Sequence, residues 1–89
     1  MALFSLGQVV ATRGAIAFCA EHAINPSQLI HKHATGDWGD LCEEDIKANV
    51  DAIAYDGRVL SSYKLHGDKL YVLTEWDRTS TCLMLANEY

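Results

Sequence analysis

Apolar residues in the first half of the chain recur at the spacing of α-helices. Ile16, Cys19, Ala20 and Ala23 form a narrow apolar stripe behind Thr12. The Thr12 hydroxyl can cap a helix by accepting a hydrogen bond from a free backbone N–H group. The stripe predicts a first helix whose small side chains let another element pack closely.

A second, shorter helix is predicted from its start and stop signals. Asn25 is a favourable N-cap, Pro26 suits the first helical position, and Gly36 can take the left-handed conformation that ends a helix. Leu29 and His33 fall on one side of this helix.

The third helix is predicted to be the longest, over residues 41–55. Asp40 is expected to be its N-cap, with Glu43 in the capping-box position and Lys47 four residues further on as an ion-pair partner. The stripe expected to be buried consists of Ile46, Val50, Ile53 and Ala54.

The hydrophobic pattern then changes to strict alternation, which is typical of strands. Residues 59–65, 70–76 and 81–85 predict three strands, and Gly67-Asp68 suits a tight hairpin turn between the first two. Three consecutive strands with short turns predict an antiparallel meander, one face of which the helices must cover.

The fold class predicted is therefore α+β, in a single domain over residues 1–89. Two short helices and one longer helix pack on a three-stranded antiparallel meander, and residues 8–11 are either a brief additional strand or a lead-in. No apolar run approaches the roughly 20 residues of a membrane helix. The N-terminus also lacks the pattern of a signal peptide, so we expect a cytoplasmic protein that does not enter the membrane.

Charge is concentrated in one part of the chain. The net charge is −5, and residues 37–56 hold seven acids and one base, whereas the rest of the chain has five acids and six bases. Such a surface disfavours direct binding to a nucleic-acid phosphate backbone and attracts a basic protein. The alternative is an ordinary solvated helix face.

The residue types of metal and nucleophile chemistry are present without their usual spacings. Asp37 and Asp40 lack the regular oxygen spacing of a calcium loop, and Cys42 at the start of the third helix is a candidate reactive thiol only. No pair of histidines has zinc-ligand spacing, so surface positions are predicted for His22, His31, His33 and His66. We predict no catalytic residue, no metal site and no cofactor.

Two polar stretches with tryptophan are the candidate contact regions. They are the block Gly36-Asp37-Trp38-Gly39-Asp40-Leu41 and the strand-turn-strand 74–81, in which Arg78 could instead make an internal ion pair. Tyrosine and tryptophan are favoured anchors of protein interfaces. The residues predicted to bind a partner are Asp37, Trp38, Glu43, Glu44, Asp51, Trp76, Asp77 and Arg78.

Several motifs together resemble a family of small uncharacterised bacterial proteins. The matching residues are Leu6-Gly7-Gln8-Val9-Val10-Ala11-Thr12, Gly36-Asp37-Trp38-Gly39-Asp40-Leu41, Asp45, Asn49, Thr74-Glu75-Trp76-Asp77-Arg78-Thr79-Ser80-Thr81 and Glu88-Tyr89. The family is met on plasmids, phages and other mobile elements, under labels such as plasmid-related protein or type I restriction subunit M. The chain departs from it at Arg13, where proline is expected, and at Ala86-Asn87, where Pro-Glu is expected. The second label does not fit, because the chain has no glycine-rich loop and no room for a doubly wound sheet.

Three functions follow as hypotheses. The first is a non-catalytic protein-binding module of a mobile element that inhibits a host defence complex, such as a CRISPR or restriction complex, through its acidic surface. The second is a small metal- or thiol-dependent hydrolase that unites Asp37 and Asp40 with a histidine or Cys42. The third is a structural or regulatory subunit that forms a homodimer through a strand edge or an aromatic face.

Overall fold

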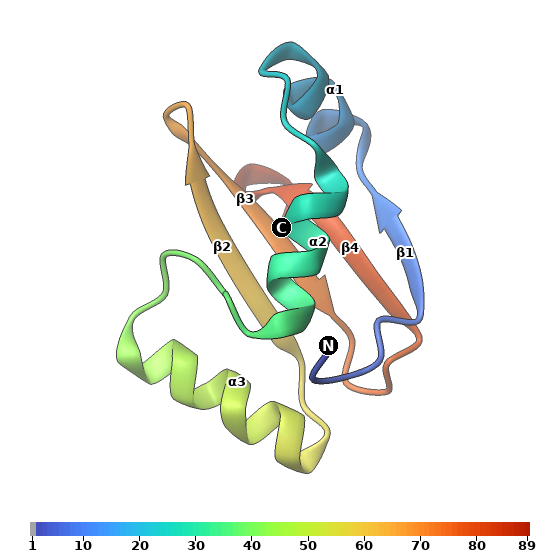
Figure 1. The fold of residues 1–89 in the computed structure, drawn as a ribbon, viewed down its shortest axis with the longest axis vertical. Coiled ribbons are helices and arrows are strands. Elements are labelled where there is room, and N and C mark those ends of the chain that lie inside the picture. The colour runs from blue at the N-terminus through green and yellow to red at the C-terminus, as the bar shows by residue number, and fades with distance from the viewer. Residues whose placement is uncertain (1) are drawn as a thin grey trace.

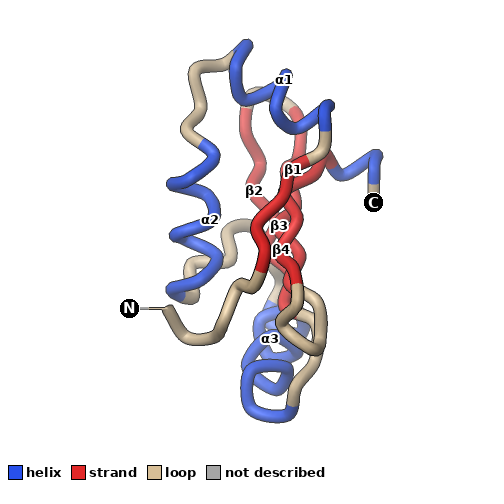
Figure 2. The backbone as a smooth tube through the Cα atoms, turned by 90° about the vertical axis from the view of Figure 1, so that its right-hand side faces the viewer, coloured by secondary structure: helices blue, strands red, loops and turns tan. Residues whose placement is uncertain are grey.

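Two helices cover one face of a four-stranded sheet, and a third helix lies across one end of that sheet (Figures 1 and 2). The computed structural model describes residues 2–89. Its elements, in chain order, are β1 (Gln8–Ala11), α1 (Arg13–Glu21), α2 (Pro26–Thr35), α3 (Glu43–Tyr55), β2 (Val59–Leu65), β3 (Asp68–Thr74), β4 (Ser80–Leu85) and a closing 3₁₀ turn (Ala86–Glu88).

The sheet is mixed, with the strand order β1-β4-β3-β2. The antiparallel meander of β2, β3 and β4 is confirmed, but a three-stranded antiparallel sheet is a wrong description, because β1 adds a fourth strand parallel to β4. Gln8 pairs with Ser80 in this ladder. The local sequence pattern does not predict a pairing between residues so far apart in the chain. The hairpin loop between β2 and β3 is His66-Gly67, one residue earlier than predicted, and both of its residues have positive φ (49° and 82°).

Most of the apolar core lies between the sheet and the two helices that cover it. Its buried members are Ala15, Phe18, Cys19, Leu29, Tyr63, Leu70, Val72 and Leu83. A smaller cluster of Trp38, Ala52 and Val59 fills the space between α3 and the end of the sheet. The third helix is therefore attached to a satellite of the core rather than to its centre.

The caps of the first two helices are as predicted, whereas the apolar stripe of α1 is not. Thr12 accepts from the Ala15 N–H at 3.1 Å, Asn25 accepts from the Ser27 N–H at 3.0 Å, and Gly36 ends α2 with φ of 96°. In α1 the buried side chains are Ala15, Phe18 and Cys19, and Ile16 is exposed. The large ring of Phe18 determines which side of α1 faces the sheet.

The start of α3 corrects a second prediction. The helix begins at Glu43, and its N-cap is Cys42, whose side chain makes no capping hydrogen bond. The Asp40 carboxylate instead accepts a hydrogen bond from the backbone N–H of Lys64 in β2 at 2.9 Å. Asp40 thus fixes the chain to the sheet rather than capping the helix.

The buried side of α3 also differs from the predicted stripe. Asn49 and Ala52 are the buried residues of this helix, and of the predicted stripe only Ile53 is partly buried against the Trp38 cluster. Ile46 and Val50 are 40% and 53% exposed. The predicted ion pair between Glu43 and Lys47 is absent from the salt bridges of residues 2–89. The side of α3 that carries Asn49 and Ala52 faces inward because the Asn49 amide binds β2.

The outer edge of β2 is closed by the segment that precedes and includes α3. The Asn49 side chain donates to the Leu60 carbonyl at 2.7 Å and accepts from the Leu60 N–H at 3.0 Å. The Ser62 N–H donates to the Trp38 carbonyl at 3.0 Å, and the Asp40 N–H donates to the Ser62 carbonyl at 2.7 Å. With the bond from Lys64 to Asp40, all three outward backbone N–H groups of β2 have partners.

This closure depends on a glycine at position 39. Gly39 forms an isolated parallel bridge with Ser62 and has φ of +74°. A Cβ atom at Gly39 would lie 2.2 Å from the Ser62 carbonyl oxygen. Only glycine lets the two backbones approach this closely.

We expect Asn49→Ala to destabilise the fold by about 2 kcal/mol, because it leaves the buried N–H and carbonyl of Leu60 without their partners. Chemical denaturation measures this loss. Lys47→Ala is the matched control on the exposed side of the same helix, and its free energy of unfolding should stay within about 0.5 kcal/mol of the parent. Equal effects of the two substitutions would show that Asn49 does not hold the edge.

Candidate functional site

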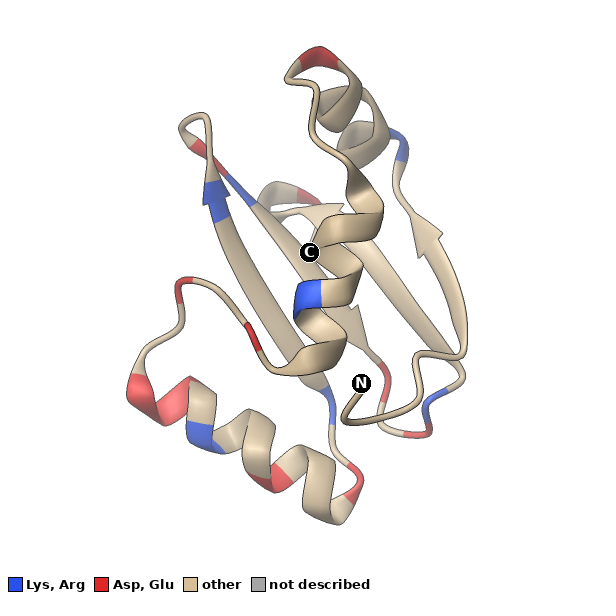
Figure 3. Cartoon of the chain, in the orientation of Figure 1, with Lys and Arg blue, Asp and Glu red and all other residues tan. Residues whose placement is uncertain are grey.

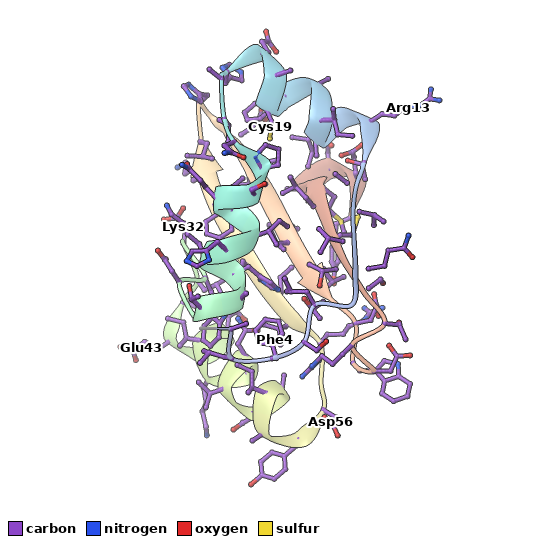
Figure 4. The ribbon with its side chains drawn as sticks, turned by 45° about the vertical axis from the view of Figure 1, so that its right-hand side comes forward. Phe4, Arg13, Cys19, Lys32, Glu43 and Asp56 are labelled. Atoms are coloured by element: carbon purple, nitrogen blue, oxygen red, sulfur yellow. The ribbon has the colours of Figure 1, made fainter. Side chains whose placement is uncertain are left out.

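The acidic part of the chain is largely the exposed surface of α3. Glu43, Glu44 and Asp45 occupy its first turn, where the positive end of the helix dipole stabilises carboxylates, and Asp51 and Asp56 continue the series. Figure 3 shows these acids along the helix with one base, Lys47, among them. Figure 4 shows Glu43 and Asp56 pointing away from the body of the molecule.

None of these carboxylates is neutralised within the described chain. The ion pairs of residues 2–89 are His22 with Glu21 and Arg58 with Glu75, and neither involves an acid of α3. The negative charge of α3 is therefore directed to solvent.

Apolar side chains share this exposed surface. Ile46 and Val50 stand one helical turn apart on α3, and Tyr55 in its last turn is 83% exposed. The exposed side of α3 therefore carries apolar side chains as well as carboxylates.

The turn between β3 and β4 is docked against the C-terminal end of α3 by Arg78. The Arg78 guanidinium donates to the carbonyl of Ala52 at 2.9 Å and to that of Gly57, and it lies 5.5 Å from the centre of the Phe4 ring. A cation at this position is stabilised by the negative end of the helix dipole. Arg78 is thus held internally, by backbone carbonyls rather than by the predicted acids.

The other two residues of this turn have different environments. Trp76 is 60% exposed. The Asp77 carboxylate accepts from the Thr79 hydroxyl at 2.7 Å and from the Thr79 N–H at 3.2 Å, and these bonds lower the pKa of Asp77. Asp77 therefore stabilises the local turn while its carboxylate remains at the surface.

The block around Trp38 divides between the surface and the core. The Trp38 ring is 8% exposed and its Nε1 donates to the His33 carbonyl at 3.1 Å, so the ring belongs to the core. The Asp37 side chain is exposed, and its backbone carbonyl accepts from the Tyr63 hydroxyl at 2.7 Å. Burial raises the pKa of Tyr63 to about 12, so this hydroxyl keeps its proton and remains a donor.

Five of the eight predicted contact residues have exposed side chains, three on α3 and two on the turn docked at its C-terminal end, and two residues that the sequence placed in the core are exposed on α3 as well. We call this set the α3 surface and define it as Glu43, Glu44, Ile46, Val50, Asp51, Trp76 and Asp77. Asp37 lies outside this set, on the segment before α3, and neither Trp38 nor Arg78 presents a free side chain to a partner. Ile46 and Val50 were missed because their spacing is that of a buried stripe.

A second polar feature, a chain of buried hydrogen bonds around His33, has no counterpart in the sequence analysis. His33 was predicted at the surface but is 0% exposed, because α2 directs its ring onto the sheet. Nδ1 lies 2.5 Å from the Ser61 hydroxyl, and Nε2 lies 2.8 Å from the Thr74 hydroxyl. Thr74 continues the chain to Thr81 at 2.7 Å.

The direction of every hydrogen bond in this chain follows from its last acceptor. The Thr81 hydroxyl donates to the backbone carbonyl of Leu6 at 2.7 Å, and a carbonyl can only accept. Thr81 therefore accepts from Thr74, and Thr74 accepts from the Nε2–H of His33. His33 is left as the neutral Nε2–H tautomer, whose Nδ1 accepts from the Ser61 hydroxyl.

This arrangement stabilises the fold rather than providing a reaction centre. Burial lowers the pKa of His33 to about 4, and a proton on Nδ1 would also oppose the donation from Ser61. Although histidine and serine are in contact, their side chains are fully buried. No side-chain N or O atom that is buried within residues 2–89 lacks a hydrogen-bond partner.

The described surface contains no further candidate for small-molecule or metal chemistry. No pocket opens among residues 2–89, and no cluster of three or more His, Cys, Asp or Glu residues in this range is placed to hold a metal ion. Cys19, Cys42 and Cys82 are free thiols, of which Cys42 is exposed. No helix in the part that the structure describes has the length and apolar character needed to cross a membrane.

Comparison of this chain with known protein families, with curated proteins and with solved structures found no match.

The buried chain around His33 predicts a pH dependence of stability. The folded pKa of about 4 lies below the ordinary value of 6.5, so between these values the unfolded chain binds a proton that the folded chain does not. The stabilisation is complete above pH 6.5 and decreases as the pH falls towards 4, by about 3 kcal/mol in total.

Denaturant unfolding from pH 7 to pH 4 measures this contribution as a difference between the parent and His33→Gln. The glutamine variant should be less stable at pH 7 and should lose less stability on acidification. Parallel pH profiles for the two proteins would contradict the assignment.

Proposed function

We propose that this chain is a non-catalytic protein-binding module whose contact surface is the α3 surface. The observation that carries the proposal is the exposure of Ile46 and Val50 between carboxylates that have no ion-pair partner among residues 2–89. The exposed apolar surface costs free energy in an isolated domain, and a partner that covers it removes that cost, while the solvated carboxylates remain free to pair with charges on the partner.

The apolar component argues for a protein partner. A surface helix normally turns its apolar stripe towards the core, but α3 buries Asn49 and Ala52 instead. Because Ile46 and Val50 are already about half buried, each contributes about 1 kcal/mol when an interface buries the rest of its side chain. Together with Trp76, a favoured interface anchor, these side chains would provide the centre of a contact.

The charged component specifies the chemistry of that partner. Glu43, Glu44 and Asp51 give the exposed side of the same helix a negative charge, which fits a partner that carries lysine or arginine beside an apolar patch. The same charge repels the phosphate backbone of nucleic acids. A basic protein surface is therefore favoured over direct nucleic-acid binding.

In its sharper form the proposal identifies the partner as a nucleic-acid-handling defence complex of the host cell. Basic grooves of such complexes have the complementary charge, and the resemblance to proteins of plasmids and phages indicates an anti-defence role. The protein would then act in the cytoplasm as an inhibitor that occupies the groove.

Neither alternative function is supported by the geometry of the α3 surface. Asp40 already accepts the Lys64 N–H, and His33 is buried, so the hydrolase hypothesis has no observation in its favour. A homodimer would use a different part of the fold, the free edge of the sheet at β1.

The test compares charge reversals of equal size at two places. Glu44→Lys with Asp51→Lys changes the α3 surface, whereas Glu21→Lys with Asp68→Lys makes the same change in net charge at exposed positions elsewhere. The tagged protein is used to capture partners from host lysate at low and high salt. We expect the first pair of substitutions to abolish capture of the partner and the second pair to leave it within about twofold.

Val50→Lys tests the apolar component separately, and it should weaken capture by at least about tenfold because the burial of an aliphatic side chain is lost. Circular dichroism confirms that each variant is folded. Undiminished capture by the Glu44→Lys and Asp51→Lys variant, or equal loss with both pairs, would overturn the proposal.

A further inference from the structure

The two edges of the sheet differ in whether their outward backbone groups have hydrogen-bond partners. The edge at β2 is closed by Trp38, Asp40 and Asn49, as described above. The edge at β1 is the opposite end of the strand order, and no helix or loop passes along its outer side in Figures 1 and 2.

The backbone groups on the outer side of β1 follow from its ladder with β4. The N–H groups of Gln8 and Thr12 donate to the carbonyls of Thr79 and Leu83, both at 3.0 Å. Because alternate residues of a strand point to opposite sides, the N–H and C=O groups of Val9 and Ala11 point outward. Among residues 2–89 no side chain or loop satisfies them by a hydrogen bond.

This edge is short but carries neither charge nor proline, which are two of the devices that prevent strands from pairing. The sequence Gln8-Val9-Val10-Ala11 has no charge and no proline, and Val9 and Val10 are both more than 40% exposed. A strand of this kind is a template for a further strand.

We propose that the outer edge of β1 pairs with β1 of a second copy of this chain, in antiparallel orientation. Val9 of each copy then lies opposite Ala11 of the other, and the two residues exchange both of their outward hydrogen bonds. The two Val10 residues face each other across the two-fold axis as a non-hydrogen-bonded pair. The result is a continuous sheet of two copies.

Two observations favour a second copy over an unrelated extended peptide. The edge is self-complementary, because its outward donors and acceptors are symmetric about Val10 and its side chains are uncharged. The ends of the strand are also complementary in charge. Arg13 follows one end of β1 as the first residue of α1, and Gly7 precedes the other end and packs against the backbone of Arg78 and Thr79.

The negative charge near Gly7 is that of Asp77. Asp77 lies on the same turn with an exposed carboxylate, and Figure 4 shows Arg13 pointing away from the body of the molecule beside β1. Antiparallel pairing brings Arg13 of each copy towards Asp77 of the other, twice by symmetry. Because the strand is short, the dimer is weak and forms as the concentration rises over roughly the micromolar to millimolar range.

Disulfide trapping tests the register in a Cys42→Ser, Cys82→Ser background, which removes the exposed thiol and the thiol next to position 10. Val10→Cys should form an intermolecular disulfide on mild oxidation, because non-hydrogen-bonded partners lie about 4.5 Å apart between Cα atoms. Val9→Cys is the matched control and should crosslink at least about tenfold more slowly, because its own counterpart is two positions out of register. Faster crosslinking of Val9→Cys would overturn the proposed pairing.

Sedimentation equilibrium tests the dimer without oxidation. The parent should dimerise reversibly, and Val10→Lys should raise the dissociation constant at least about tenfold by placing two cations at the axis. Val9→Pro, which removes an outward N–H without touching the ladder with β4, should have the same effect. The proposal would be overturned if the parent stays monomeric, even if it binds extended peptides of other sequence. It would also be overturned if the parent forms a dimer that neither substitution weakens.

Val50→Lys serves as the control that separates this inference from the proposed function. It alters the α3 surface and should leave the dissociation constant of the dimer within about twofold. Conversely, Val10→Lys should leave partner capture through α3 unchanged, so the two proposals fail independently.

Discussion

The closure of the β2 edge is the constraint on which the rest of the structure depends. A sheet edge exposes donors and acceptors that must be paired, covered or protected. Here the chain returns along β2, and backbone groups around Gly39, the Asp40 carboxylate and the Asn49 amide satisfy that edge in turn. Because Asn49 is the group that reaches the strand, α3 presents the side that carries Asn49 and Ala52 inward.

The exposed apolar side of α3 is a consequence of that geometry. With Asn49 and Ala52 facing the sheet, Ile46 and Val50 are left at the surface among carboxylates. Arg78 then fixes the far end of the helix and brings the turn with Trp76 next to it. The candidate binding surface is therefore built by the same contacts that close the sheet.

The buried chain from Ser61 to Leu6 holds the layers together at a different point. His33 comes from α2, Ser61, Thr74 and Thr81 come from three strands, and Leu6 comes from the segment before β1. Because every member has a partner, the polar groups specify one arrangement of helix, sheet and N-terminal segment. A proton on His33 would disturb that arrangement as a whole.

Local signals in the sequence predicted the elements well, and non-local pairing is where prediction failed. Caps at Thr12 and Asn25 and the alternation of β2 to β4 are properties of neighbouring residues, and they were confirmed. The parallel pairing of β1 and the burial of His33 depend on residues far apart in the chain.

The errors in α3 have the same origin. Asp40 has the spacing of a cap, and Ile46 and Val50 have the spacing of a core stripe, but bonds from Asp40 and Asn49 to β2 override both signals. The acids of the candidate surface were identified because charge is visible in sequence, whereas its apolar centre was not.

Amide hydrogen exchange in dilute solution is the most direct test of this asymmetry between the two edges. The N–H groups of Leu60, Ser62 and Lys64 should be protected by their partners across the closed edge, and those of Val9 and Ala11 should exchange rapidly. Rapid exchange at all three positions of β2, or equal protection of Val9 and Ala11 in dilute monomer, would contradict the account.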